Sequence, residues 1–152
     1  FLCGPRTATS TQDREKGFLT ELGNHPNIEF TTSFAEDYSF KAGRDEMLRL
    51  LKEGDPAEAY FCGDDVLSIG VLSAIRDMNL KVPEDIGIIG LNDMDMASWA
   101  NIDLTTIHNP LKDIIRKSID LVTALVEDET IKPAAHLFEC SVVERGTLRP
   151  LP

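Results

Sequence analysis

The sequence predicts an α/β fold: a parallel β-sheet flanked by helices, with Rossmann-like topology. The first observation behind this prediction is that short apolar runs alternate with longer segments of helical periodicity, a pattern typical of a parallel sheet covered by helices. The second is size, because 152 residues, 42% of them hydrophobic and 27% charged, can bury the core of one domain. The third is that an apolar run stops abruptly at polar residues in DIGIIGLNDMDM, which starts at Asp85.

Four short runs rich in apolar residues are the predicted strands. Each is four to six residues long, which is an ordinary length for a strand. They are residues 1–4, 28–32, 57–62 and 86–91.

The first predicted helix follows the first strand. Thr9 or Ser10 is positioned to cap it, with Gln12 and Asp13 as partners in a capping box. Apolar residues then recur at helical spacing up to Gly23, where the helix is expected to end.

Two further helices are predicted between the remaining strands. One starts near Ser39 and stops at Gly54, because glycine favours helix ends. The other covers residues 66–78 and ends at Asn79, which tolerates the left-handed conformation. This last helix is apolar almost all round, so we expect the sheet to bury one face and a partner to bury the other.

Polar residues follow each predicted strand, at what should be one edge of the sheet. Ligands of open parallel sheets bind beyond the carboxyl ends of the strands, so these residues are candidates for a small-molecule site. Any one of them could instead merely cap a helix or turn, but four clusters together favour the polar site. The clusters are residues 4–7 with Arg14, residues 36–38, residues 63–65 and residues 92–93.

Arg14 and Tyr38 each have two interpretations. Arg14 shares a helix face with Gly17 and Phe18, so its guanidinium either lies in solvent or reaches as a hydrogen-bonding fork into the cleft. Tyr38 offers a flat ring that can lie against a sugar or base and a hydroxyl that can hydrogen-bond. Alternatively, it is a half-buried aromatic that supports its loop.

The net charge of −11, from 26 acidic and 15 basic residues, argues against nucleic-acid binding by this chain, because phosphate contacts need a basic patch. It also disfavours docking on an anionic membrane, and no apolar run is long enough to span one.

The three cysteines, Cys3, Cys62 and Cys140, lie far apart in apolar runs, which suggests buried thiols in a reducing compartment. We expect no metal site and no cofactor, since the histidines are scattered.

Several short motifs occur together in the chain. They are RxxGF from Arg14, DxxxxGxxxA from Asp65, VPEDI from Val82, LTTIxxP from Leu104 and VERGT from Val143. In this combination they resemble the effector-binding core of the lactose-repressor (LacI/GalR) family of bacterial transcription regulators. The resemblance covers nearly all of the chain.

The resemblance implies a two-lobed core of the periplasmic-binding-protein-like type (type I). Residues 1–107 would form its C-terminal lobe, and residues 108–132 a return helix that normally packs in the N-terminal lobe. Residues 133–152 would supply a final strand and tail in the C-terminal lobe, with hinge crossings near His108 and Asn109 and near Pro133. We expect the helix-turn-helix head and most of the N-terminal lobe to lie outside this chain.

The resemblance also implies an effector site made by Arg14, Tyr38, Asp64 and Asn92. Asn92 stands where many family members have Asp, and its amide offers a donor and an acceptor without charge. This favours a neutral hydroxylated effector over a cationic one. A sugar or related polyol is the expected effector, ahead of a nucleobase.

A homodimer is implied as well, with a two-fold contact formed by the apolar third helix and residues 97–102. The alternative is that the other lobe or the return helix covers this face of the helix. The predicted interface residues are Leu67, Val71, Leu72, Ile75 and Trp99.

The expected function is therefore effector binding and dimerisation within a cytoplasmic regulator that contacts operator DNA only through its head. A periplasmic sugar-binding protein of a transport system is the alternative, but the unpaired cysteines and the regulator-like tail argue against it. An enzyme is not expected. Asp64 and Asp65 could act as acid and base, yet no Gly-rich phosphate loop, Ser-His-Asp arrangement or metal cluster accompanies them in the sequence.

Overall fold

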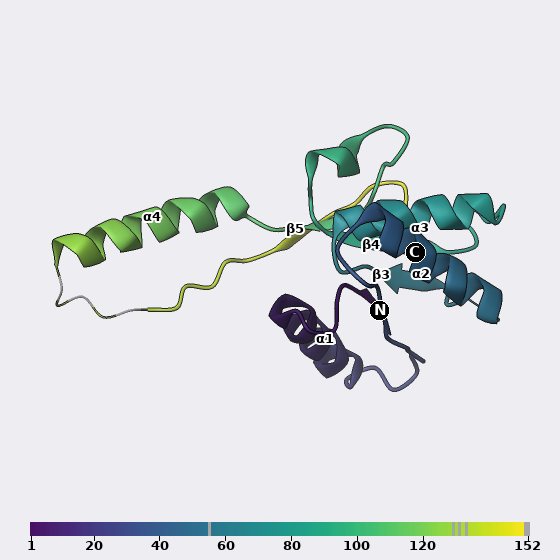
Figure 1. The fold of residues 1–152 in the computed structure, drawn as a ribbon, viewed down its shortest axis with the longest axis horizontal. Helices are drawn as coiled ribbons and strands as arrows, with labels where there is room; N and C mark the ends of the chain where they lie inside the picture. Colours follow the sequence, from purple (N-terminus) through teal and green to yellow (C-terminus); the bar gives the residue numbers. More distant parts are fainter. Residues whose placement is uncertain (55, 129, 131, 133, 151–152) are drawn as a thin grey trace.

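Helices and strands alternate along the chain in the computed structural model, which describes residues 1–54, 56–128, 130, 132 and 134–150 (Figure 1). The predicted α/β alternation is confirmed. The elements are β1 (Leu2–Cys3), α1 (Thr9–Leu22), β2 (Ser33–Phe34), α2 (Phe40–Glu53), β3 (Ala59–Phe61), α3 (Asp65–Asp77), β4 (Gly87–Asn92), the 3-10 helix η1 (Asp95–Ser98), β5 (Thr106–His108), α4 (Leu111–Glu127) and β6 (Ser141–Val143).

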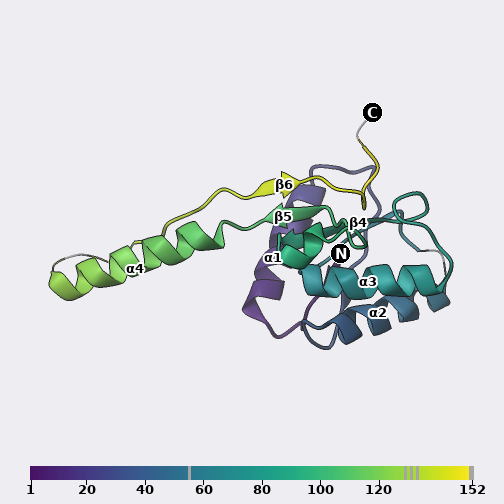
Figure 2. The same cartoon turned by 90° about the horizontal axis from the view of Figure 1, so that it is seen from above.

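The strands form a mixed sheet. β1 pairs in parallel with β2, and β3, β4 and β5 pair in parallel with one another. A bridge between Leu2 and Cys62 joins β1 to the end of β3, and the Gly63 N–H donates to the Leu2 carbonyl at 2.9 Å. The predicted parallel sheet is thus confirmed for these strands. β6 is the exception, because it runs antiparallel to β5 where the chain returns from α4 (Figure 2).

α2 and α3 lie side by side and pack closely (Figure 2). A Cβ at Gly70 would lie 2.1 Å from the carbonyl oxygen of Phe40, and one at Gly43 would lie 2.5 Å from that of Leu67. Because these neighbours are backbone atoms, a larger residue at either position would force the helices apart. α2 therefore covers a second side of α3, beside the side that faces the sheet, and this explains why α3 is apolar almost all round.

Four of the five residues predicted for a dimer interface lie in the interior of this single chain. Leu67, Val71 and Ile75 have no exposed surface, and Leu72 is 1% exposed. Their prediction as interface residues is therefore corrected: α2 and the sheet already bury them, so they have no surface to offer a second protomer. Trp99 is different, since it is 57% exposed.

α1 is attached to the sheet by an aromatic cluster. The ring of Phe18 lies 5.2 Å from that of Phe1 and 5.8 Å from that of Phe61, measured between centroids, and the latter two rings are stacked. This cluster explains the position of Phe18 in the sequence pattern, since such contacts add to simple burial of apolar surface.

The predicted capping box of α1 is wrong. Ala8 is the N-cap residue and makes no side-chain cap, while Thr9 and Ser10 lie inside the first turn. The start is set earlier because the Ala8 N–H donates to the Pro5 carbonyl at 3.0 Å, which forms a turn directly before the helix. By contrast, the predicted cap of α2 is confirmed, since the Ser39 hydroxyl accepts from the Ala42 N–H at 3.1 Å.

The second strand was predicted at residues 28–32 but lies at Ser33–Phe34. Ile28 and Phe30 are 51% and 50% exposed, so the apolar run lies beside the sheet instead of in it. Pairing with β1 begins where the Ser33 N–H donates to the Phe1 carbonyl at 2.9 Å. Apolar character alone could not locate that register.

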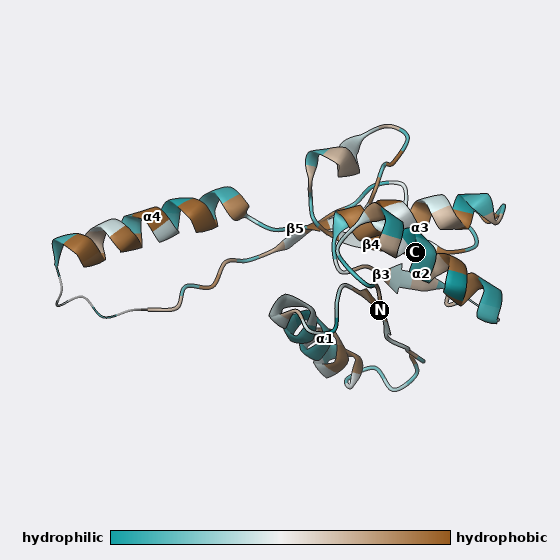
Figure 3. Ribbon diagram, in the orientation of Figure 1, coloured by the Kyte–Doolittle hydropathy of each residue, from teal (hydrophilic) through white to brown (hydrophobic). Residues whose placement is uncertain are grey.

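α4 projects from the body of the molecule, and the returning segment of residues 134–140 runs back beside it (Figures 1 and 2). Apolar residues recur along this helix (Figure 3), yet none of its residues is buried, and Ile119 and Val126 are 61% and 79% exposed. Within the described ranges no helix has the length and apolar character needed to cross a bilayer. The chain leaves the body after His108, whereas Pro133, the second predicted crossing, lies outside the described residues.

Candidate functional site

The parallel strands bring their carboxyl ends to one edge of the sheet, which we call the rim. Gly4 follows β1, Gly63 and Asp64 follow β3, and Asn92 ends β4. The register links them, because the Gly63 N–H bonds to β1 and Asn92 pairs with His108 of β5. The topology thus places these strand-end residues at the same edge, as expected from the sequence.

Arg14 extends from α1 to the rim. Its Nη1 donates to the Gly63 carbonyl at 2.8 Å and to the Tyr38 hydroxyl at 3.3 Å, and the guanidinium carbon lies 5.9 Å from the centre of the Tyr38 ring. Both bonds use Nη1. Among the described residues, Nη2 and Nε have no partner, so a planar pair of donors is left for a ligand. Of the two interpretations, the fork pointing toward the cleft fits this geometry.

Tyr38 packs flat against backbone. A Cβ at Gly4 would lie 2.2 Å from its ring and one at Gly63 would lie 3.3 Å from it, so both glycines make room for the aromatic side chain. The hydroxyl lies 2.7 Å from Oγ1 of the buried Thr11 and also accepts from Arg14. Tyr38 therefore holds Arg14 in place. Contact between its ring and a ligand stays a prediction.

Asp64 is the N-cap residue of α3. Its Oδ1 accepts from the Leu67 N–H at 2.7 Å. Asp64 therefore has the helix-capping role that a carboxylate at a strand end often has. Burial raises the pKa of Asp64, and the Leu67 N–H and the nearby Arg14 charge oppose that rise only in part. Since the cap uses Oδ1, the second oxygen can still accept from a ligand.

Asn92 is half-buried and adopts φ 113°, a backbone conformation that few non-glycine residues take. Its side chain makes no hydrogen bond to any other residue that the structure describes. An amide at the rim without a protein partner can bond to a ligand through both its oxygen and its nitrogen. The grouping of Arg14, Tyr38, Asp64 and Asn92 into one ligand site stays a prediction.

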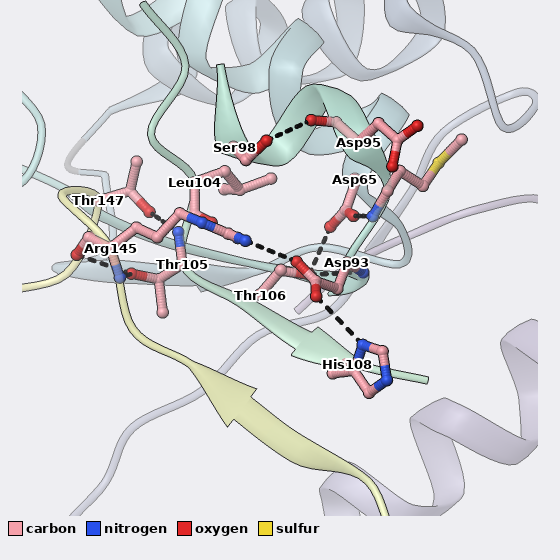
Figure 4. A network of polar contacts seen from close by, with 11 residues as sticks. Asp65, Asp93, Asp95, Ser98, Leu104, Thr105, Thr106, His108, Arg145 and Thr147 are labelled. Carbon is pink, nitrogen blue, oxygen red and sulfur yellow. Dashed lines mark hydrogen bonds and ion pairs between the residues drawn. The ribbon is translucent and has the colours of Figure 1, made fainter. Parts of the chain in front are cut away.

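The sequence interpretation missed an ionic network next to Asn92 (Figure 4). Oδ1 of Asp93 accepts from Nη2 of Arg145 at 2.7 Å, and Oδ2 lies 3.1 Å from Nδ1 of His108. Burial opposes ionisation of Asp93, but the bonds from Arg145 and His108 outweigh it and hold the pKa of Asp93 below its usual range. All three residues stand in motifs singled out from the sequence, but spacing along the chain gave no indication that they touch.

A second carboxylate, that of Asp65, also binds the turn that follows β4. Asp65 has no exposed surface; its Oδ1 accepts from Thr106 Oγ1 at 2.5 Å, and its Oδ2 accepts from the Met94 N–H at 2.7 Å. Gly90 makes room for it, because a Cβ there would lie 2.3 Å from Oδ1. Burial raises the pKa of Asp65, and its two hydrogen bonds counter that rise in part.

The described residues contain no group of three or more His, Cys, Asp or Glu side chains able to hold a metal ion.

Burial raises the pKa of both Cys3 and Cys62 to about 12, so neither thiol ionises at neutral pH. The prediction of a buried thiol is confirmed for these two and wrong for Cys140, which is exposed.

A hollow with a volume of about 390 Å³ lies away from the rim. It lies where the end of α3 meets the loops around Val82, Asn101 and Gly146. None of the four predicted effector residues lines it.

Comparison with known proteins settles the family. The model of the periplasmic binding protein-like domain matches residues 1–148. The chain belongs to this family. Its curated relatives include the HTH-type transcriptional repressor CytR of Escherichia coli K12, 35% identical over 116 residues, which are 76% of this chain and 34% of that protein. The ribose operon repressor of the same strain is 29% identical over 147 residues, 96% of this chain and 44% of that protein.

Solved structures agree with the sequence relatives. A lac repressor dimer bound to operator and an anti-inducer superposes with a TM-score of 0.87 at 27% identity, covering 97% of this chain and 51% of that one. A LacI-family regulator from Corynebacterium glutamicum gives a TM-score of 0.83 at 29% identity, with 98% and 58% covered. The resemblance of this periplasmic binding protein-like chain to the LacI/GalR effector-binding core is therefore confirmed. The chain spans between a third and a half of the length of these two curated relatives.

Proposed function

We propose that this chain supplies one wall of the effector cleft in a longer LacI-type transcription regulator, and that the effector is a sugar or related polyol. The observation that carries the proposal is the pair of polar groups left without protein partners at the rim. Arg14 keeps a planar pair of donors and Asn92 keeps its amide, while Tyr38 and Thr11 hold Arg14 in position. Such convergent polar groups at the carboxyl edge suit a hydroxylated ligand.

The charge balance at the rim supports a neutral effector. Arg14 lies near enough to Asp64 to oppose the rise of its pKa, so the positive charge has a partial counter-charge in the protein. Asn92 adds no charge at the position where many family members carry Asp. A ligand with several hydroxyls can accept from Arg14 and both donate to and accept from Asn92.

The test uses the complete protein that carries this chain. A thermal-shift screen with D-ribose, D-galactose, sorbitol and adenine selects a ligand, and D-ribose comes first because a ribose operon repressor is among the relatives. Arg14→Ala should then remove charge-assisted hydrogen bonds of ~1.5–3 kcal/mol and weaken binding ~10- to 150-fold in isothermal titration. Tyr38→Phe should have a smaller effect in the same direction, since it only loosens Arg14.

The matched control is Arg49→Ala, which removes an arginine paired with Glu46 and Glu53 on the outer side of α2. It should leave affinity unchanged. Equal affinities of the wild type and Arg14→Ala would show that the rim residues only cap and brace the fold.

The exposed apolar side of α4 supports our assignment of residues 108–132 to the other lobe. An unburied stripe with Ile115, Ile119 and Val122 each at least half exposed needs a cover, and we infer that the N-terminal lobe provides it. With this assignment, residues 1–107 belong to the C-terminal lobe, residues 108–132 to the N-terminal lobe, and residues 133–152 again to the C-terminal lobe.

We also propose that the complete protein is a homodimer. Since four predicted interface residues are buried, the contact is assigned to the half-buried side of α3, with Val66, Ile69 and Ser73, together with the exposed Trp99. Arg76 of α3 donates to the Asn101 carbonyl at 2.9 Å, which fastens the loop that carries Trp99 to this helix. Trp99→Ala should shift the complete protein toward monomer in sedimentation, because exposed aromatic residues anchor interfaces.

DNA binding is assigned to a head outside this chain, and the cytoplasm is the proposed compartment. The net charge of −11 disfavours phosphate contacts by this chain. The named relatives are transcriptional repressors, which supports a regulator without catalytic activity over both the enzyme and the transport protein.

A further inference from the structure

The turn that follows β4 is held in a strained conformation. Asn92 and Asp93 are consecutive non-glycine residues with φ 113° and 52°. Such conformations are uncommon for non-glycine residues and persist where the surroundings impose them. Two bonds impose this one: the Met94 N–H donates to Asp65 at 2.7 Å, and the Asp93 N–H points to Thr106 Oγ1 at 3.4 Å. These two bonds fasten the turn that carries Asn92 at the rim and Asp93 beside it.

The carboxylate of Asp93 contacts both chain segments of the hinge. His108 is the last residue of β5, and Arg145 follows β6 by two positions. Each donates to a different oxygen of Asp93, at 3.1 and 2.7 Å. The carboxylate is 20% exposed and the Arg145 side chain 17% exposed. Both oxygens of Asp93 are therefore engaged by protein partners from the two segments.

Arg145 cannot follow Asp93 if the turn moves, because it is fixed by other bonds. Its Nη1 donates to the Leu104 carbonyl at 2.8 Å, its backbone N–H donates to Thr105 Oγ1 at 2.8 Å, and that hydroxyl donates back to its carbonyl at 2.9 Å (Figure 4). The tail is thus a firm anchor for one side of Asp93.

His108 lies where the chain leaves the body. It pairs with Asn92 of β4 on one side and with Ser141 of β6 on the other. It is the last residue of the ladder before α4 begins at Leu111. A bond from Asp93 to its ring therefore acts at the base of α4.

We propose that Asp93 is a positioning residue that ties the rim at Asn92 to both hinge segments, through His108 and Arg145. The inference rests on the function proposed above. Asp93 holds Asn92 toward the ligand and holds the end of β5 in its ladder. A change at either place is carried to the other, because the intervening turn is fastened by its bonds to Asp65 and Thr106.

The experiment compares Asp93→Asn with the wild type in the complete protein, by two independent readouts. The first is hydrogen exchange of the peptides covering residues 104–110 and 141–147, which needs no ligand; exchange should be several-fold faster in the variant. The second is the affinity for D-ribose in isothermal titration, which should fall about tenfold, within the usual range of coupling between sites.

Three controls separate positioning from loss of stability. Asp95→Asn removes the same charge two residues away and should change neither readout. Ile75→Val removes a methylene group from the buried core and so lowers stability, and it should leave both readouts unchanged. His108→Asn keeps a donor near the position of Nδ1 and should behave like the wild type, whereas His108→Ala should behave like Asp93→Asn.

The outcomes are distinct. Unchanged exchange in Asp93→Asn overturns the proposal, and so does an affinity loss no greater than that of Ile75→Val. If the wild-type protein does not bind D-ribose, the first ligand suggested for the proposed function is rejected. The exchange readout then decides alone: faster exchange in Asp93→Asn and His108→Ala, but not in His108→Asn, supports the tie between turn and hinge.

Discussion

α3 and α4 are both rich in apolar residues, but α3 is buried in the structure and α4 is exposed. Both are long helices with many branched apolar residues, yet α3 has eight buried residues and α4 has none. The difference lies in what surrounds them, since α3 is enclosed by α2 and the sheet while α4 projects into solvent (Figure 3). Helical periodicity reveals that a helix has an apolar side, but the partner of that side has to come from elsewhere.

The largest expected effect tests this contrast directly. In the 152-residue chain, Leu72→Ala should lower the free energy of unfolding by ~2–5 kcal/mol, because it leaves a cavity in a closed core. Ile119→Ala should change it by less than ~0.5 kcal/mol, because 61% of Ile119 is exposed. Urea unfolding followed by circular dichroism measures both.

The same pair sharpens the comparison when it is repeated in the complete protein. If the N-terminal lobe covers α4, Ile119→Ala should then cost ~2–5 kcal/mol like any buried truncation. An equally small effect in both contexts would contradict our assignment of α4 to that lobe.

A smaller effect is expected from adding a methyl group at the close contact between α2 and α3. Gly70→Ala should destabilise the chain by ~1–3 kcal/mol, because its Cβ would meet the backbone of Phe40. Gly17→Ala is the matched control, since nothing lies within 4 Å of a Cβ at that exposed position of α1. It should stabilise the chain by ~0.5–1 kcal/mol through helix propensity alone. Thermal unfolding of the two variants should shift in opposite directions.

The smallest expected effect distinguishes the two carboxylates beside the Asn92 turn. The pKa of Asp93 is lowered in the folded protein, so its contribution to stability is present above the unfolded pKa of ~3.9 and is lost as the pH falls through the folded pKa. The pKa of Asp65 is raised by burial, so its contribution is present below the unfolded pKa and is lost as the pH rises through the folded pKa.

Urea unfolding of Asp93→Asn and Asp65→Asn between pH 3 and 7 measures these opposite trends. The destabilisation caused by Asp93→Asn should grow by ~1 kcal/mol as the pH rises, and that caused by Asp65→Asn should shrink. Parallel curves for the two variants would mean that the two sites have similar electrostatic surroundings.

Most of the fold could be predicted from local patterns. Ser39 and Gly54 bound α2 as expected, and Asn79, with φ 57°, ends the third helix. The misplaced second strand and the capping box of α1 failed for one shared reason. Both depend on which backbone groups meet in space, at Phe1 and Ser33 and in the turn at Pro5, and apolar or polar character does not encode that.

For the candidate site, the residues at the strand ends could be predicted from the sequence, but their partners from distant segments could not. The strand ends place Asp64 and Asn92 at one edge, as the topology of a parallel sheet requires, and Arg14 reaches that edge from α1. The partners of Asp93 could not be found in this way, since Arg145 lies 52 positions away in the chain. Contacts between segments so distant in sequence depend on tertiary packing, which a single sequence does not display.

The antiparallel pairing of β5 with β6 has a mechanical consequence. The outgoing and returning segments leave the body next to each other, at His108 and Ser141, which are partners in one ladder. Because the ladder joins the two segments at this point, the base of α4 cannot be displaced without also displacing or unpairing the start of β6.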